Sequence, residues 1–97
     1  MRRAATIDAN QPEIVRSLNA AGATVQSLSA VGDGVPGLLV GYRGTTYLLE
    51  VKDGAKPPSA RELTPAQIEW HVNWTGGSCV VVNSADEALA AIGATNG

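Results

Sequence analysis

Two apolar runs at residues 38–42 and 45–52 are separated by only two residues, Arg43 and Gly44. A two-residue loop with glycine at its second position is typical of a tight β-hairpin, because such turns need positive φ. The two runs are therefore predicted to pair as antiparallel strands. This pairing would also bring residues 34–37, which precede the first strand, alongside the end of the second.

Three segments begin with the pattern of a helix N-terminus, in which a short polar residue is followed three positions later by Glu or Gln. The pairs are Asn10 with Glu13, Thr64 with Gln67, and Ser84 with Glu87. Pro12 and Pro65 fall in the first turn, where the missing N–H of proline costs nothing. These patterns predict helices over about residues 11–21, 65–75 and 85–92.

Two further runs have the character of strands, at residues 23–28 and 79–82. The second is continuously apolar and lies between two helices, so it is predicted to be a strand covered on both faces. The element order is then αβββαβα. The predicted fold class is α/β, with a mixed four-stranded sheet flanked by helices.

The composition limits the architecture to one small domain. A chain of 97 residues with 44% hydrophobic residues supplies a single core, predicted over about residues 10–92 with frayed ends at 1–9 and 94–97. Seven basic against nine acidic residues exclude a polybasic tail and an acidic disordered segment. One cysteine excludes a disulfide or zinc-finger set, and with no signal peptide or membrane-length apolar run, the expected location is the cytoplasm.

The second strand of the hairpin ends in an acid and a base, Glu50 and Lys52. Because side chains alternate along a strand, both lie on the same face, about 7 Å apart. One interpretation is a solvated strand end whose charges screen each other. The other is a carboxylate metal ligand beside a lysine, an arrangement suited to Mg²⁺ and to orienting a water molecule.

The order of several short motifs resembles a known family. The segment 34–41 (Gly-Val-Pro-Gly-Leu-Leu-Val-Gly), then Glu50-Val51-Lys52, then Gln67 in the first turn of a helix, resembles the PD-(D/E)XK nuclease superfamily. More narrowly, it is similar to small stand-alone VRR-Nuc domains and phage Holliday-junction-resolvase-like endonucleases. The resemblance implies a restriction-endonuclease-like αβββαβα core and a DNA endonuclease that uses Mg²⁺ or Mn²⁺. It also implies branched or structured DNA as substrate and a bacterial or phage-infected cytoplasm. A homodimer is expected, because a two-fold symmetric protein can place two active sites on a two-fold symmetric junction.

The resemblance also assigns roles to residues. Glu50 matches the metal-binding carboxylate, and the Val51 carbonyl matches an additional metal ligand. Lys52 matches the lysine that positions or activates the attacking water. Glu13 matches an acidic residue on the first helix near the active site, and Gln67 matches a glutamine that supports the site.

One position departs from the family pattern. The aspartate of the Pro-Asp pair is a principal metal ligand in the family, whereas this chain has Pro36 followed by Gly37. Glycine offers no ligand, so metal affinity and catalysis are expected to be weak or absent. Asp33 is a conceivable surrogate, although four extended residues span about 13 Å. A natural inactive variant and a deliberate substitution both account for Gly37.

Basic residues are few, but Arg43, Lys56 and Arg61 are predicted to flank the site and contact DNA phosphates. The last two belong to the long 53–63 segment, which is interpreted as a binding loop. Ordinary surface charge is the alternative. Two other function classes also remain open: a non-catalytic DNA-binding or protein-interaction module that keeps the nuclease fold, and a structural domain without a nucleic-acid role.

Four other side chains, those of His71, Trp70, Trp74 and Cys79, are candidates for chemistry or packing. His71 is interpreted as a surface or packing residue rather than a general base. Trp70 and Trp74 lie one helical turn apart and favour a core or dimer contact over stacking on nucleobases. Cys79 is interpreted as a small buried apolar residue.

Overall fold

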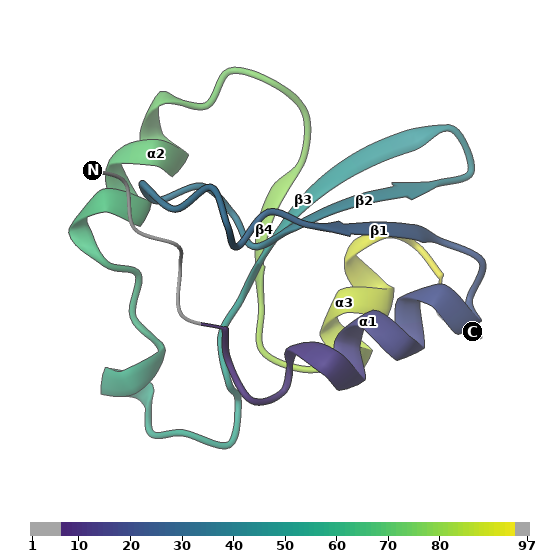
Figure 1. The fold of residues 1–97 in the computed structure, drawn as a ribbon, viewed down its shortest axis with the longest axis horizontal. Coiled ribbons are helices and arrows are strands. Elements are labelled where there is room, and N and C mark those ends of the chain that lie inside the picture. Colours follow the sequence, from purple (N-terminus) through teal and green to yellow (C-terminus); the bar gives the residue numbers. More distant parts are fainter. Residues whose placement is uncertain (1–6, 95–97) are drawn as a thin grey trace.

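The computed structural model describes residues 7–94. It contains three α-helices, four strands and one short 3₁₀-helix in the predicted order (Figure 1). They are α1 (Gln11–Ala20), β1 (Thr24–Ser27), β2 (Leu38–Tyr42), β3 (Thr45–Val51), η1 (Pro58–Arg61), α2 (Pro65–Asn73), β4 (Cys79–Val82) and α3 (Ala85–Ala91). Every predicted helix and strand is present within these residues, and only η1 was not predicted. Residues 1–6 and 95–97, which include most of the predicted frayed ends, lie outside the described residues.

The four strands form one mixed sheet in the order β1-β2-β3-β4. β1, β2 and β3 are antiparallel neighbours, whereas β4 is parallel to β3. The β2–β3 hairpin turns at Arg43 and Gly44, whose φ angles are +49° and +81°. The predicted hairpin is therefore confirmed, with both turn residues in the left-handed region that such a turn requires.

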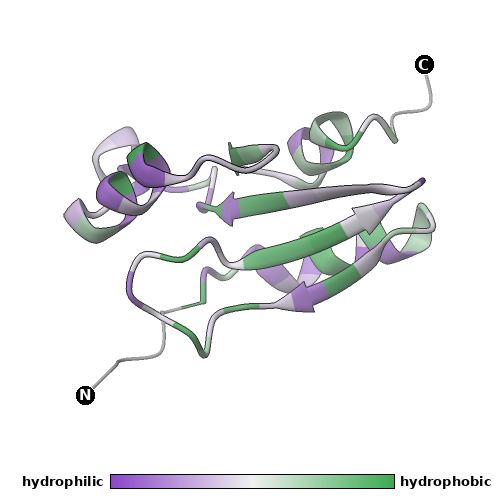
Figure 2. Ribbon diagram, turned by 90° about the horizontal axis from the view of Figure 1, so that it is seen from above, coloured by the Kyte–Doolittle hydropathy of each residue, from purple (hydrophilic) through white to green (hydrophobic). Residues whose placement is uncertain are grey.

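The core lies between one face of the sheet and the pair α1 and α3 (Figure 1). Alternate strand residues point into it, which is why hydrophobic positions run along the strands in Figure 2. The helices contribute residues at helical spacing. The fully or almost fully buried members are Ile14, Leu18, Leu38, Val40, Leu49, Val51, Val82, Ala88 and Ile92.

The opposite face of the sheet is only partly covered, since Leu39 of β2 points away from the core and is 37% exposed. β4 is an edge strand, and of its four residues only Val82 is buried, while Val80, which pairs with the core residue Leu49, is 37% exposed at the edge of the other face. The prediction that this strand is covered on both faces was therefore wrong. A continuous apolar run does not distinguish an interior strand from an edge strand that leaves hydrophobic side chains exposed.

The helix N-termini are confirmed to different degrees. Thr64 and Gln67 form the complete reciprocal capping box, and Ser84 accepts a bond from the Glu87 N–H. Asn10 forms no side-chain cap. Its amide instead donates to the carbonyls of Lys52 and Asn83, so it ties α1 to the ends of β3 and β4.

The loop between β1 and β2 packs directly on the first turn of α2 at Gly34. This glycine has φ +83°, and a Cβ there would collide with the Ala66 backbone carbonyl. Only glycine permits both the backbone conformation and the close approach.

Gly34→Ala is expected to destabilise the fold by more than about 2 kcal/mol, because positive-φ strain and a backbone collision add. Gly44→Ala is the matched control, since Gly44 has φ +81° and open space around its Cβ position. It should cost about 1 kcal/mol. Urea unfolding measures the free energy of unfolding of both variants. An equal decrease in the two would show that the loop at residue 34 moves away from α2 without an energetic cost.

Candidate functional site

The candidate site lies where β3 ends, on the side of the sheet that faces α2. Leu49 and Val51 point into the core, so Glu50 and Lys52 point the other way. Both charged side chains are nevertheless buried, at 6% and 9% exposure. The solvated strand end considered as the alternative interpretation is therefore wrong.

Glu50 is held in an environment that disfavours its charge. Burial raises the pKa of its carboxyl group to about 7, the Lys52 ammonium opposes that change, and the Asp8 carboxylate adds to it. Glu50 Oε1 is buried and has no hydrogen-bond partner among the described residues. A buried carboxylate oxygen without a donor is costly, and a bound cation would remove that cost.

Lys52 is joined to α2 through Gln67. The Lys52 ammonium donates to Gln67 Oε1 at 2.9 Å, and the same oxygen accepts the Thr64 N–H at 2.8 Å. The capping box thus fixes the glutamine side chain, and the glutamine in turn fixes the lysine. The structure brings together Glu50, Lys52 and Gln67, three of the residues singled out from the sequence.

Position 37 lies beside Glu50. Leu38 pairs with Leu49, and continuing that antiparallel register by one residue sets Gly37 opposite Glu50. Directly opposed residues share a face of the sheet, with Cα atoms about 4.5–5.5 Å apart. A Cβ on Gly37 would make only an ordinary contact, 3.4 Å from Gln11 Oε1. A side chain at this position can therefore begin without a clash and would point to the same face as Glu50.

Two residues near the site were not predicted. Asp8 is close enough to Glu50 to raise its pKa, and its backbone carbonyl accepts the Gln11 N–H. Gln11 is buried at 7% exposure beside Gly37. The prediction of a frayed end through Ala9 missed Asp8. Gln11 could have been found from its spacing to Ile14 and Leu18, the buried stripe of α1.

Glu13 was expected near the site but lies elsewhere. It is exposed, since the helical period that buries Gln11 and Ile14 turns residue 13 away from the sheet. It lines a separate pocket of about 450 Å³ with Asp53, Arg61 and several other polar residues. The first-helix side chain beside position 37 is Gln11 instead.

The three residues predicted to contact DNA, Arg43, Lys56 and Arg61, do not lie together. Arg43 lies at the hairpin tip, with its guanidinium 5.1 Å from the centre of the Tyr42 ring, at the end of β3 opposite to Glu50. It does not flank the site as predicted, because the hairpin that defines the register also carries its turn away. Lys56 lies within 3.8 Å of Asp8, and Arg61 belongs to η1.

The carboxylates suit a hard divalent cation only in part. Asp8 and Glu50 supply oxygen donors, and the Val51 carbonyl is next in sequence. No group of three or more His, Cys, Asp or Glu side chains within residues 7–94 is placed to hold a metal ion. Asp33 instead lines a pocket with Trp70 and Trp74. The described side chains alone thus do not make up a metal site, and position 37 is where the family pattern would add a carboxylate.

His71 and Cys79 form a neighbouring pair, with 3.6 Å between Nδ1 and Sγ. Burial lowers the pKa of His71, and the Lys52 charge lowers it further. Burial raises the pKa of the Cys79 thiol, and the Glu50 charge raises it further. Both therefore favour their neutral forms and act as packing residues between α2 and β4.

The fold of the chain is similar to that of a solved structure. The chain is similar to a VRR_NUC domain. The similarity to that solved structure has a TM-score of 0.62 and 27% sequence identity, and it covers 89% of this chain and 97% of the other. No protein-family model matches the chain, and no curated protein matches it.

The likeness to the VRR_NUC domain confirms the predicted fold class, a restriction-endonuclease-like α/β fold with a mixed four-stranded sheet and flanking helices. The residues assigned from the family resemblance stay predictions. No helix between residues 7 and 94 is long and apolar enough to cross a membrane.

Proposed function

We propose that this chain is a DNA endonuclease of the divalent-metal-dependent class, with its site at Glu50, Lys52 and Gln67. The observation that carries the proposal is the buried Glu50 carboxylate with an unpartnered Oε1, held beside a lysine that α2 fixes in place. The similarity to a VRR_NUC domain supports the nuclease assignment.

Glu50, Asp8 and the Val51 carbonyl would hold the cation, Mg²⁺ or Mn²⁺. Such an ion, when bound, polarises the phosphoryl oxygens and lowers the pKa of a coordinated water. Lys52 supplies positive charge beside the reacting phosphate, where negative charge develops during hydrolysis. Gln67 acts through Lys52, because its oxygen accepts a bond from the ammonium and so limits the orientations of that group.

We further propose that the substrate is branched or structured DNA and that phosphate contacts come from Lys56 and Arg61. These two residues belong to the segment that joins the end of β3 to α2, the two elements that make the site. Arg43 would contact only a longer stretch of DNA, since it lies at the far end of the hairpin.

Gly37 weakens this site, because the chain has glycine where the family pattern has a metal-binding aspartate. The observation also favours a second candidate function, a non-catalytic module that binds DNA without cleaving it. The two candidates differ in their response to metal: the nuclease site binds a divalent cation through Glu50, whereas the module binds DNA with or without one.

A homodimer is proposed on the partly open face of the sheet. Leu39 is 37% exposed there, and together with Leu48 and Trp74 it helps to line a hollow of about 270 Å³. Exposed apolar area on a small domain is typical of an interface, and a two-fold dimer would present two sites to a two-fold symmetric junction. Leu39→Lys should convert a dimer to a monomer in sedimentation equilibrium. A monomer before the substitution would contradict the proposal.

The metal site is tested by Mn²⁺ binding, followed by the loss of free-ion signal in electron paramagnetic resonance. Weak binding, in the millimolar range, is expected for this chain because few charged ligands are present. Glu50→Gln should abolish it, whereas Glu62→Gln, at an exposed position, should not change it. Cleavage of a four-way junction, a flap and a plain duplex with Mn²⁺ defines the substrate. Identical Mn²⁺ binding by the Glu50 and Glu62 variants would contradict the metal site.

Gln67→Ala is expected to reduce any cleavage about tenfold, because Lys52 loses the acceptor that fixes it. The matched control is Thr64→Ala, which removes the hydroxyl cap of the Gln67 N–H but keeps the Lys52 to Gln67 bond. Both variants should lose about 1 kcal/mol of stability through the cap. Only Gln67→Ala should lose activity, and an equal loss in both would assign Gln67 a purely structural role.

A further inference from the structure

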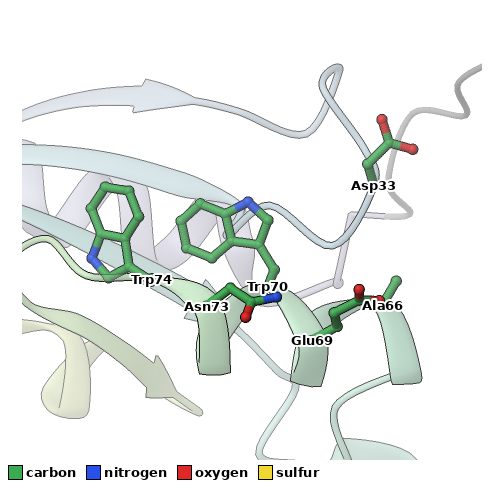
Figure 3. A pocket seen from close by; sticks show the side chains of 6 residues that line it. All are labelled: Asp33, Ala66, Glu69, Trp70, Asn73 and Trp74. Carbon is green, nitrogen blue, oxygen red and sulfur yellow. The ribbon is translucent and has the colours of Figure 1, made fainter.

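A pocket of about 490 Å³ lies between α2 and the loop that joins β1 to β2 (Figure 3). It is called the tryptophan pocket here, and its lining residues are Asp33, Ala66, Glu69, Trp70, Asn73 and Trp74. We propose that the tryptophan pocket binds an unpaired nucleobase of the DNA strand whose phosphodiester lies at Lys52. The proposal rests on the proposed function and names the structural feature of the substrate.

The aromatic rings are already arranged for stacking. Trp70 and Trp74 stack with their ring centres 4.9 Å apart and their planes 16° apart. The Trp74 indole N–H donates to the Gly77 carbonyl at 2.8 Å, which holds that ring in place. In Figure 3, Trp70 lies between Trp74 and Asp33. A planar ligand in the tryptophan pocket therefore meets an aromatic pair that is already stacked.

The polar lining selects a base rather than a phosphate. The pocket has the carboxylates of Asp33 and Glu69 and the amide of Asn73, and no basic side chain. Carboxylates repel phosphate but accept hydrogen bonds from the N–H groups of bases. The DNA backbone must then run outside the tryptophan pocket, on the side where Lys52 lies.

The tryptophan pocket and Gln67, the residue that positions Lys52, share one helix. Gln67, which bonds to Lys52, lies three residues before Trp70 on α2. Side chains at this spacing are neighbours, with Cβ atoms about 5–6 Å apart. A phosphate at Lys52 and a base on Trp70 can thus belong to the same or adjacent nucleotides. Duplex DNA offers no such base, whereas a single-stranded flap does.

Core packing does not account for the pair. No residue of α2 is buried, and Trp74 is 41% exposed. The rings therefore remain available to a ligand, and their removal should leave the fold intact. A tryptophan pair of this kind stabilises a bound single strand by stacking, about tenfold or more in affinity for each base.

The test compares a single-stranded oligonucleotide with an abasic strand of the same length, in EDTA so that cleavage plays no part. The chain has only two tryptophans, and both line the pocket, so intrinsic fluorescence reports on this site; Trp74 also lines the hollow on the sheet face, and the Trp70→Ala variant distinguishes the two. We expect the intact strand to quench it and the abasic strand to do so weakly. By anisotropy of labelled DNA, Trp70→Ala should weaken binding of the intact strand about tenfold and leave the abasic strand unchanged.

Two further variants keep the result specific. Trp70→Phe retains an aromatic face and should keep most of the affinity, and Val72→Ala, at a position 77% exposed on α2, should change nothing. Equal binding of intact and abasic strands would overturn the proposal. The proposal would also be overturned if Trp70→Ala left DNA binding unchanged and altered only the oligomeric state in sedimentation. The two tryptophans would then form a contact between protein chains.

The outcome is separable from that of the proposed nuclease. Base-dependent binding without cleavage by any variant would support the tryptophan pocket and refute the catalytic assignment. If a Gly37→Asp variant cleaves DNA but the chain binds intact and abasic strands equally well, base binding by the tryptophan pocket would be refuted and the nuclease assignment would stand.

Discussion

Gly37→Asp is expected to raise metal-dependent DNA cleavage by at least about a hundredfold. The register sets position 37 opposite Glu50, and its Cβ position is open apart from an ordinary contact with Gln11. A carboxylate there completes a set of oxygen ligands, and stabilisation of the transition state by a well-held cation amounts to several kcal/mol. Each 1.4 kcal/mol corresponds to a factor of ten in rate.

The measurement is initial-rate cleavage of a four-way junction, a flap and a duplex with Mg²⁺ or Mn²⁺. Gly37→Asn is the matched control, because it has the size of aspartate but no charge, and it should stay near the level of the original chain. Combining Gly37→Asp with Lys52→Ala should remove the gained activity. A folded Gly37→Asp protein that cuts none of the substrates would refute the nuclease site, and DNA binding without metal would then favour the non-catalytic module.

Local patterns in the sequence predicted the parts of the site that follow from strand geometry. The two-residue turn at Arg43 and Gly44 determines the register of β2 and β3, and that register aligns position 37 with Glu50. Period-two alternation then predicts that Glu50 and Lys52 share a face. These relations need only the backbone of one hairpin, so one sequence was sufficient.

The remaining features depend on how separate elements pack. Glu13 and Gln11 are both polar residues in the first turn of α1, and only the direction in which that helix docks decides that Gln11 reaches position 37. Asp8 approaches Glu50 because Asn10 ties the start of α1 to the end of β3. Helical spacing identifies Gln11 as a buried position, but it does not predict which residue of another element that side chain meets. The same holds for Asn10 and Lys52, which are 42 positions apart.

Glu50→Gln is expected to stabilise the protein by about 3 kcal/mol above pH 7 in metal-free buffer. A pKa of about 7 in place of 4.5 means that the folded state holds a proton that the unfolded state releases between these values. Each tenfold difference in proton affinity corresponds to about 1.4 kcal/mol. The original chain should therefore lose stability as pH rises from about 4.5 to 7, whereas the amide variant should not.

Urea unfolding at pH 4.5 and pH 8 in EDTA measures this effect, with the exposed Glu62→Gln as the control that should follow the original chain at both values. At pH 4.5 the stability difference between Glu50→Gln and the original should nearly vanish, because Glu50 is then protonated when folded. An equal difference at both pH values would mean that the charge of Glu50 is not the source. A pH-dependent gain would show that the fold keeps a destabilising carboxylate at this position, and burial of such a group is expected where it serves a ligand rather than the core.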